Sequence, residues 1–66
     1  MAVQNKLKTI RMSEFFLNKR EFAKVLDISE NQYIRYENNK NSPSLEICLK
    51  ISDKLNRTVN DIWYID

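Results

Sequence analysis

Two helix starts of the same kind lie close together in this chain, and they constrain its fold more than any other feature. Asn18 is followed three places later by Glu21, and Ser29 is followed three places later by Gln32. Each pair is typical of a capping box, in which side chains and backbone N–H groups of the two residues bond reciprocally. Asp27, a residue that tolerates a left-handed backbone, ends the first of these helices. About three residues therefore join the two helices, and so short a junction fixes the angle between them.

Apolar residues repeat with helical spacing on both helices and predict a shared buried face. Two tyrosines on one side of the second helix could in principle stack on single-stranded bases. Their spacing with the apolar residues of the preceding helix favours core packing instead. The residues expected inside are Phe22, Ala23, Leu26, Ile28, Tyr33 and Tyr36.

The residues before this pair predict another helix, over about residues 5–14. Leu7 and Ile10 lie on its inner stripe, because three residues make almost one helical turn. Phe15 and Phe16 then follow as a run without helical periodicity, and we expect them to fill the space between this helix and the next.

Two further helices are predicted after the pair. Ser44 caps a fourth helix that ends near Leu55, where Asn56 can close it in a left-handed conformation. Thr58 caps a fifth helix, and Asp61 completes a third capping box. The expected inner residues are Leu45, Cys48, Leu49, Ser52 and Leu55 in the fourth helix, and Val59, Ile62 and Trp63 in the fifth.

No strand alternation and no internal repeat is evident, so residues 1–66 are expected to form one all-α domain of five helices. Cys48 is the only cysteine, which excludes an intrachain disulfide and a cysteine zinc cluster and fits a reducing, cytoplasmic setting. No apolar run approaches the roughly 20 residues that cross a bilayer. Histidine and glycine are both absent. Catalysis, phosphate-cradling loops, metal sites and cofactors are therefore not expected.

Several features at fixed offsets resemble the Cro and lambda-repressor type of helix-turn-helix domain, also called the xenobiotic-response-element family. They are the six buried positions of the helix pair, then "YEN", then "SPSLE", and the ending "NRTVNDIW". The resemblance covers roughly residues 5–63 and implies a compact lambda-repressor-like fold whose second and third helices form the helix-turn-helix. It also implies an ion pair between Arg11 and Glu37. The chain departs from the family at Asp27 and Asn39, where glycine is usual, and "RMSEFFLN" is one residue longer than the common spacing.

In this family the second helix of the pair lies in the major groove of DNA. Helical spacing puts its polar residues on the side opposite the two tyrosines. Arginine can bond guanine O6 and N7, and asparagine or glutamine can bond adenine N6 and N7. The residues expected to read bases are Glu30, Asn31, Gln32, Ile34 and Arg35.

Two of these residues have a second explanation. Ile34 can contact a thymine methyl group, or it can lie at the edge of the core. Glu30 can accept a hydrogen bond from cytosine N4, or it can serve only to stabilise the positive end of the helix dipole.

A second group is expected to bind phosphates and position the domain without reading sequence. Its members lie at a helix start and in the loop after the reading helix, where the family grips the DNA backbone. For Lys40 and Asn41, the other explanation is that they belong to an ordinary solvated loop. The group is Lys19, Asn38, Lys40 and Asn41.

The C-terminal residues 62–66 carry more apolar side chains than so small a core is expected to bury. Exposed apolar patches mark interfaces, so we expect a homodimer through Trp63, Tyr64 and Ile65. The other explanation is that these residues fold back onto their own domain. A dimer would set two reading helices about one turn of B-DNA apart, which suits a pseudo-palindromic operator.

The sequence therefore predicts a DNA-binding transcriptional regulator, a small repressor that binds a double-stranded operator and has neither a membrane partner nor an evident small-molecule effector. Repression comes only from the family resemblance. The alternative is an antitoxin-like interaction module whose main ligand is another protein. A regulator should bind DNA alone, with an affinity that falls steeply with salt.

Overall fold

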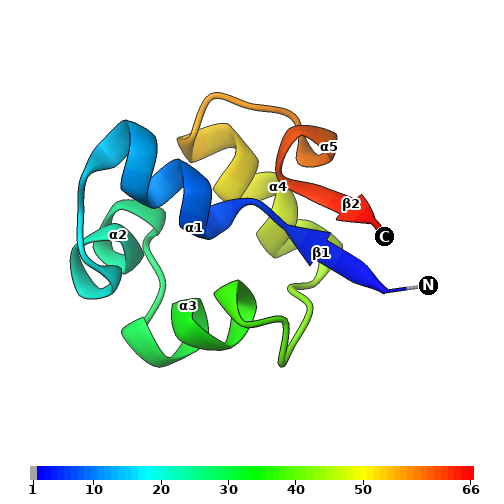
Figure 1. Cartoon of the computed structure of the whole chain (residues 1–66), viewed down its shortest axis with the longest axis horizontal. Helices are drawn as coiled ribbons and strands as arrows, with labels where there is room; N and C mark the ends of the chain where they lie inside the picture. The colour runs from blue at the N-terminus through cyan, green and yellow to red at the C-terminus, as the bar shows by residue number, and fades with distance from the viewer. Residues whose placement is uncertain (1) are drawn as a thin grey trace.

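The computed structural model describes residues 2–66 and shows five short α-helices packed around one core, with a small sheet at the chain ends (Figure 1). The all-α prediction is confirmed, and the sheet is a minor addition to it. None of the helices in these residues is long and apolar enough to cross a membrane. The elements are β1 (Val3–Asn5), α1 (Leu7–Ile10), the π-helical turn η1 (Arg11–Phe15), α2 (Lys19–Leu26), α3 (Glu30–Glu37), α4 (Leu45–Lys54), α5 (Val59–Ile62) and β2 (Trp63–Ile65).

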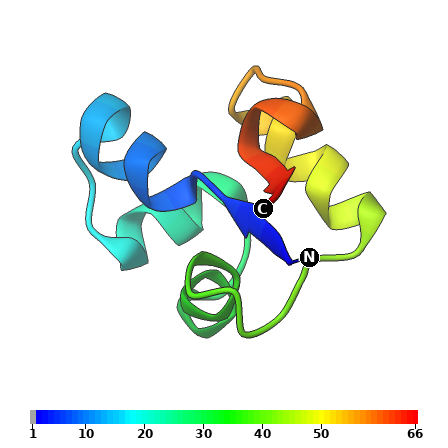
Figure 2. The same ribbon diagram turned by 45° about the vertical axis from the view of Figure 1, so that its right-hand side comes forward.

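The core draws on every helix of the described chain. In Figure 2, α1, α2 and α3 lie on one side and α4 with α5 on the other. The buried side chains of these helices form one hydrophobic cluster. Cys48 belongs to this core as a small apolar residue, and burial raises the pKa of its thiol. The buried apolar residues are Leu7, Ile10, Phe22, Ala23, Leu26, Tyr33, Cys48, Ile51, Leu55, Ile62 and Trp63.

The predicted starts of the second to fifth helices are confirmed. The side chain of Asn18 accepts a hydrogen bond from the N–H of Glu21 at 2.8 Å, and Ser29 accepts one from Gln32 at 3.2 Å. Ser44 caps α4 in the same way. The residues with positive φ include the three that were expected to take the place of glycine, namely Asp27 (60°), Asn39 (60°) and Asn56 (56°).

The predicted start of the first helix was wrong by two residues. Asn5 belongs to β1, and its side-chain Oδ1 accepts a hydrogen bond from the N–H of Leu7, where α1 begins. The helical path then continues through η1, a π-helical turn. At the start of α1, the Asn5 side chain therefore satisfies the N–H of Leu7, which the helix itself leaves free.

The predicted role of Phe16 was also wrong. Only Phe15 packs between the first two helices, with its ring 5.2 Å from the ring of Phe22. Phe16 is 81% exposed and takes a left-handed backbone (φ 54°) that ends η1. The chain thus uses Phe16 to turn towards α2, and this conformation directs its side chain to solvent.

The predicted inner stripe of α4 was partly wrong. Leu45 is 71% exposed and Leu49 is 54% exposed, whereas Ile51 is buried. The helix is rotated so that Cys48, Ile51 and Leu55 face the core. Ser52 can lie beside them because its hydroxyl donates a hydrogen bond to the carbonyl of Cys48 at 2.7 Å, which satisfies its polar group within the same helix.

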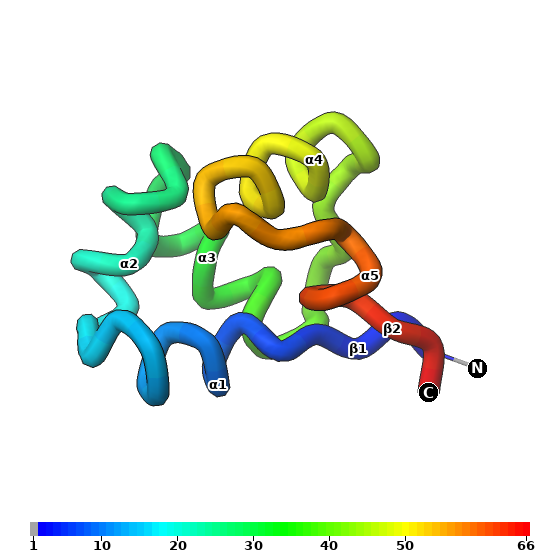
Figure 3. The backbone as a smooth tube through the Cα atoms, turned by 90° about the horizontal axis from the view of Figure 1, so that it is seen from above, coloured from blue at the N-terminus to red at the C-terminus, as the bar shows by residue number. Residues whose placement is uncertain are grey.

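The two chain ends pair as a short antiparallel sheet that was not predicted. The Cα partners are Val3 with Ile65, Gln4 with Tyr64 and Asn5 with Trp63. In Figure 3 both ends lie together at one end of the molecule, with β1 beside β2. Three-residue strands are too short to show an alternating pattern, and the pairing brings together the most distant parts of the chain.

Candidate nucleic-acid interface

Helix α3 is held against the domain by its two tyrosines. Tyr33 is fully buried and packs edge to face on Phe22, with the ring centroids 5.3 Å apart and the planes at 84°. Tyr36 is half-buried and packs against the same core. These contacts confirm that the tyrosines are core residues, and they leave the opposite side of α3 free of the domain.

The side of α3 away from the tyrosines is polar and open to solvent. Glu30, Asn31 and Arg35 are exposed, and Ile34 is half-buried. Within residues 2–66, none of these four side chains makes a hydrogen bond or an ion pair with another residue. Their hydrogen-bonding groups are therefore available to a ligand.

Gln32 differs from its neighbours because its carbonyl oxygen already has a partner. Its Oε1 accepts a hydrogen bond from the N–H of Ser29 at 3.3 Å, which completes the capping box. The same Oε1 also accepts the hydroxyl of Ser29 at 3.4 Å, so both of its lone pairs have partners. The side-chain NH₂ still has two donors to offer. Gln32 can therefore donate to an acceptor in a groove, but the two-way bond to adenine would need the cap to open.

Ile34 lies at the boundary between the two explanations offered for it. It is half-buried, yet it is not among the partly buried residues that pack against the core. Part of its apolar surface therefore faces outward between the polar residues of α3.

Three of the four residues expected to bind phosphates lie in the turn directly after α3, and the fourth begins α2. Lys19 is the first residue of α2 and is half-buried, while Asn38, Lys40 and Asn41 are exposed in the turn that follows α3. The backbone N–H of Lys40 donates to the carbonyl of Arg35 at 2.9 Å. The turn therefore folds back on the last turn of α3.

A buried ion pair fixes the end of α3 relative to the first helical segment. Arg11 Nη2 lies 3.4 Å from Glu37 Oε1, and both side chains are at most 10% exposed. Arg11 also donates to the carbonyl of Leu17 at 3.0 Å. The pair implied by the family resemblance is thus present. Burial raises the pKa of the neighbouring Tyr33 hydroxyl, and the charge of Glu37 adds to this effect.

Asn5 and Gln4, for which the sequence predicts no role at the site, contact the end of α3 and the turn after it. Asn5 Nδ2 donates to the carbonyl of Tyr36 at 2.8 Å and to Asn39 Oδ1 at 2.9 Å. Asn39 Nδ2 in turn donates to Gln4 Oε1 at 2.8 Å. These contacts join parts of the chain more than thirty residues apart, so no local sequence signal could have revealed them.

The C-terminal residues form β2, which pairs with β1. Trp63 is 8% exposed because its own chain covers it, whereas Tyr64 is 44% exposed and Ile65 is 67% exposed. The amine of Lys6 lies 5.7 Å from the centre of the Tyr64 ring. The expected dimer contact stays a prediction, and Tyr64 and Ile65 are the members of the expected set that remain accessible to a partner.

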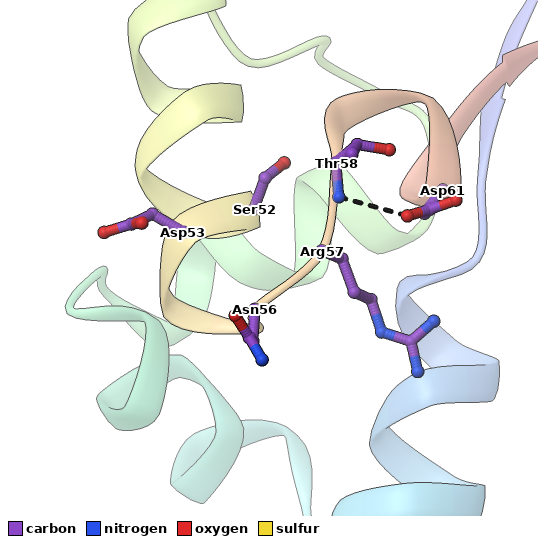
Figure 4. Close-up of a pocket in the computed structure, with 6 residues that line it drawn as sticks. All are labelled: Ser52, Asp53, Asn56, Arg57, Thr58 and Asp61. Carbon is purple, nitrogen blue, oxygen red and sulfur yellow. Dashed lines mark hydrogen bonds between the residues drawn. The ribbon is translucent and has the colours of Figure 1, made fainter.

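A shallow hollow of about 320 Å³ lies at the connection between α4 and α5 (Figure 4). Its polar lining includes Asp53, Arg57 and Asp61, and the Asp61 carboxylate accepts the N–H of Thr58 at 3.1 Å. No residue of α3 or of the turn after it lines this hollow. Within residues 2–66 no three His, Cys, Asp or Glu side chains are grouped as metal ligands would be.

Comparison with known families agrees with this geometry. A sequence model of the helix-turn-helix family matches residues 7–62, which is most of the chain and includes both α2 and α3. No curated protein matches the chain.

Proposed function

Because this chain belongs to the Cro and lambda-repressor type of helix-turn-helix family, which consists of DNA-binding regulatory domains rather than enzymes, we propose that it is a sequence-specific repressor of transcription. In this proposal the protein acts in the cytoplasm and binds a double-stranded operator through α3. It would block transcription by occupying that operator.

The exposure of Asn31 and Arg35 on the side of α3 opposite buried Tyr33 carries this proposal. A helix can read base edges only if its polar side chains can enter the major groove without first leaving the domain. Had the amide and guanidinium groups been packed inward, α3 could not serve as a reading helix.

The side chains of α3 suggest distinct roles in base reading. Arg35 would bond guanine O6 and N7, and Asn31 would bond adenine N6 and N7. Gln32 would donate from its NH₂ group alone, because its oxygen belongs to the capping box. Ile34 would contact a thymine methyl group, and Glu30 would accept from cytosine N4.

The phosphate-binding residues would hold the domain in register. Lys19 and Lys40 would each neutralise a phosphate, while Asn38 and Asn41 would add hydrogen bonds to phosphate oxygens. Because such contacts release counterions, the affinity should fall steeply as salt rises.

Selection of binding sites from random duplex DNA, followed by salt titration of the selected site, tests this function. We expect one recurring sequence with two related halves, and a linear decrease of log affinity with log salt. Recovery of no preferred sequence by the purified protein would contradict the proposal.

The operator would be bound by a homodimer that uses the exposed C-terminal residues. Tyr64 and Ile65 offer apolar surface on β2, and Trp63 would support them from inside the core. Replacing Ile65 with lysine should weaken the dimer, because a charge would lose its hydration in an apolar contact. Sedimentation equilibrium would measure this change, and an unchanged oligomeric state would contradict the assigned interface.

An antitoxin-like role, in which the main ligand is another protein, is the second candidate. The observation that favours it is the amount of exposed apolar surface, since Leu45 and Leu49 on α4 are exposed as well as the C-terminal pair. The two functions separate cleanly: a regulator binds its DNA site alone, whereas a protein-interaction module shows no site preference until its partner is present.

A further inference from the structure

Three amide side chains join the N-terminal strand to the turn that follows α3. This amide cluster consists of Gln4, Asn5 and Asn39. Asn39 stands at its centre, where it accepts a hydrogen bond from Asn5 at 2.9 Å and donates one to Gln4 at 2.8 Å. Asn5 also donates to the carbonyl of Tyr36 at 2.8 Å, so the cluster grips both the last turn of α3 and the residue after it.

The turn after α3 has few other ties to the domain. The backbone N–H groups of Asn39, Lys40 and Asn41 all donate to carbonyls of α3 itself, on Tyr36 or Arg35. Among the hydrogen bonds identified in residues 2–66, the amide cluster supplies the side-chain bonds that join residues 38–41 to another element. Asn39 is therefore the residue of this turn whose side chain ties it to an element other than α3.

The strand at the other end of the cluster is firmly placed. The N–H of Lys6 donates to the carbonyl of Ile62, and that of Asp66 donates to Ala2, each at 2.9 Å. Asn5 lies opposite Trp63, which is buried in the core. Hence β1 offers a fixed point to which the turn can be attached.

We propose that the amide cluster positions the DNA-gripping turn, so that the N-terminal strand is part of the binding machinery although it contains no DNA-contacting residue. This inference rests on the proposed function. Asn39 holds the turn in the position from which Lys40 and Asn41 can contact the phosphates of DNA that is bound at α3. Loss of the cluster should therefore weaken binding to every sequence alike, because phosphate contacts carry no sequence information.

The chain offers a closely matched pair of variants to test this role. Asn39 and Asn56 both have a left-handed backbone, with φ of 60° and 56°, and both are exposed. Glycine adopts this backbone at no steric cost, so Asn39→Gly and Asn56→Gly each remove an amide without straining the chain. Asn56→Gly should unfold at or slightly above the wild-type temperature. Asn39→Gly should unfold at or slightly below it, because two exposed side-chain hydrogen bonds are lost with the amide.

The two variants should differ in DNA binding. Asn39→Gly is expected to weaken the selected site and its base-substituted forms alike, by about three- to tenfold, which is the range that one or two hydrogen bonds account for. The slope of log affinity against log salt should fall by about one, as expected when a lysine loses its phosphate. Asn56→Gly should bind like wild type, since Asn56 lies at the end of α4, away from the cluster.

A third variant separates positioning from direct contact with DNA. Gln4→Ala removes the hydrogen bond that Gln4 of β1 accepts from Asn39. It should lower the affinity and the salt slope, but by less than Asn39→Gly does. The double variant Gln4→Ala/Asn39→Gly should bind about as well as Asn39→Gly alone. If Gln4→Ala binds like wild type while Asn39→Gly does not, Asn39 acts on DNA by itself and the positioning role is overturned.

Failure of the inference can be told apart from failure of the proposed function. Wild-type affinity and salt slope in Asn39→Gly would overturn the inference while leaving the DNA-binding role intact. A wild-type chain that selects no duplex sequence would overturn both.

Discussion

Helices α2 and α3 are alike in length and in the way they begin, yet they bury very different surfaces. Each has eight residues and starts with a capping box. Helix α2 buries Phe22, Ala23 and Leu26, whereas α3 buries Tyr33 alone. The capping boxes decide where a helix forms, and the side-chain pattern decides whether its surface serves the core or remains available to a ligand.

This difference separates stability from recognition within one short motif. The apolar side chains of α2 are buried in the core, so substitutions of these residues should change the stability of the fold. Helix α3 is held along one side by Tyr33, Tyr36 and the ion pair of Glu37, and its other side can vary without disturbing the core. Substitutions of the buried residues of α2 should therefore change stability and leave base preference unchanged. Substitutions on the exposed side of α3 should change base preference and leave stability unchanged.

The largest effect is expected for Phe22→Ala in α2. Phe22 is fully buried and contacts both Phe15 and Tyr33, so its removal leaves a cavity that the rings around it cannot fill. The free energy of unfolding should fall by about 3–5 kcal/mol, which urea unfolding followed by circular dichroism would measure.

The variant Phe22→Leu provides the control, since a domain this small can lose its fold with Phe22→Ala. It keeps most of the apolar volume and should cost less than about 1.5 kcal/mol. Under conditions where it is folded, its preference among DNA sites should match wild type. A changed base preference in Phe22→Leu would break the separation between the two helices.

The next effect concerns the ion pair that attaches α3 to the first helical segment. Glu37→Gln leaves the buried guanidinium of Arg11 without its counter-charge and should destabilise the fold by about 3 kcal/mol. The control is Glu14→Gln, which breaks the ion pair between Glu14 and Arg57, whose side chains are more exposed. That change should cost less than about 1 kcal/mol. Equal losses in the two variants, measured by urea unfolding, would show that burial does not set the strength of these pairs.

The third effect lies on the exposed side of α3 and should leave stability alone. Arg35→Ala should relax the preference at one base pair of the operator by about 1–3 kcal/mol, because a bidentate bond to guanine is lost. Lys40→Ala should instead weaken all sites alike and lower the salt slope by about one. Binding titrations with every single-base change of the operator would distinguish them. Equal and sequence-independent losses from both changes would contradict the role of Arg35.

Features set by neighbouring residues could be predicted from the sequence. The capping boxes at Asn18 and Ser29 depend on side chains three places apart, and the left-handed residues Asp27, Asn39 and Asn56 depend on local backbone preference. The buried and exposed sides of α3 also follow from helical spacing alone. These features are independent of where the rest of the chain lies.

Features that depend on contacts between distant parts of the chain could not be predicted from the sequence. The sheet pairs Val3 with Ile65, and the amide cluster joins Asn5 to Asn39. The spacing of Leu45 and Leu49 predicts a stripe on α4, but the side that faces the core depends on how the helix packs. Leucine is common on exposed surfaces, so its presence in a stripe does not fix that direction.

The smallest effect concerns the third capping box, at the start of α5, and extends the comparison of helix starts to a titrating residue. The Asp61 carboxylate accepts the N–H of Thr58, and this backbone hydrogen bond is the main reason that the pKa of Asp61 lies below its usual value. A pKa lowered by folding means that the unfolded chain binds the proton more tightly. Asp61 therefore contributes stability above its unfolded pKa, and this contribution is lost as pH falls through its folded pKa.

The isosteric change Asp61→Asn keeps an oxygen acceptor for the cap but cannot titrate. Between about pH 5 and pH 2, the unfolding temperature of wild type should fall more than that of Asp61→Asn, with a difference below about 4 °C. Calorimetric scans of the two proteins across this range would measure it. Parallel curves would mean that the capping carboxylate adds nothing through its charge, and that the boxes of α2, α3 and α5 all act through geometry, with the difference between helices arising only from what their faces bury.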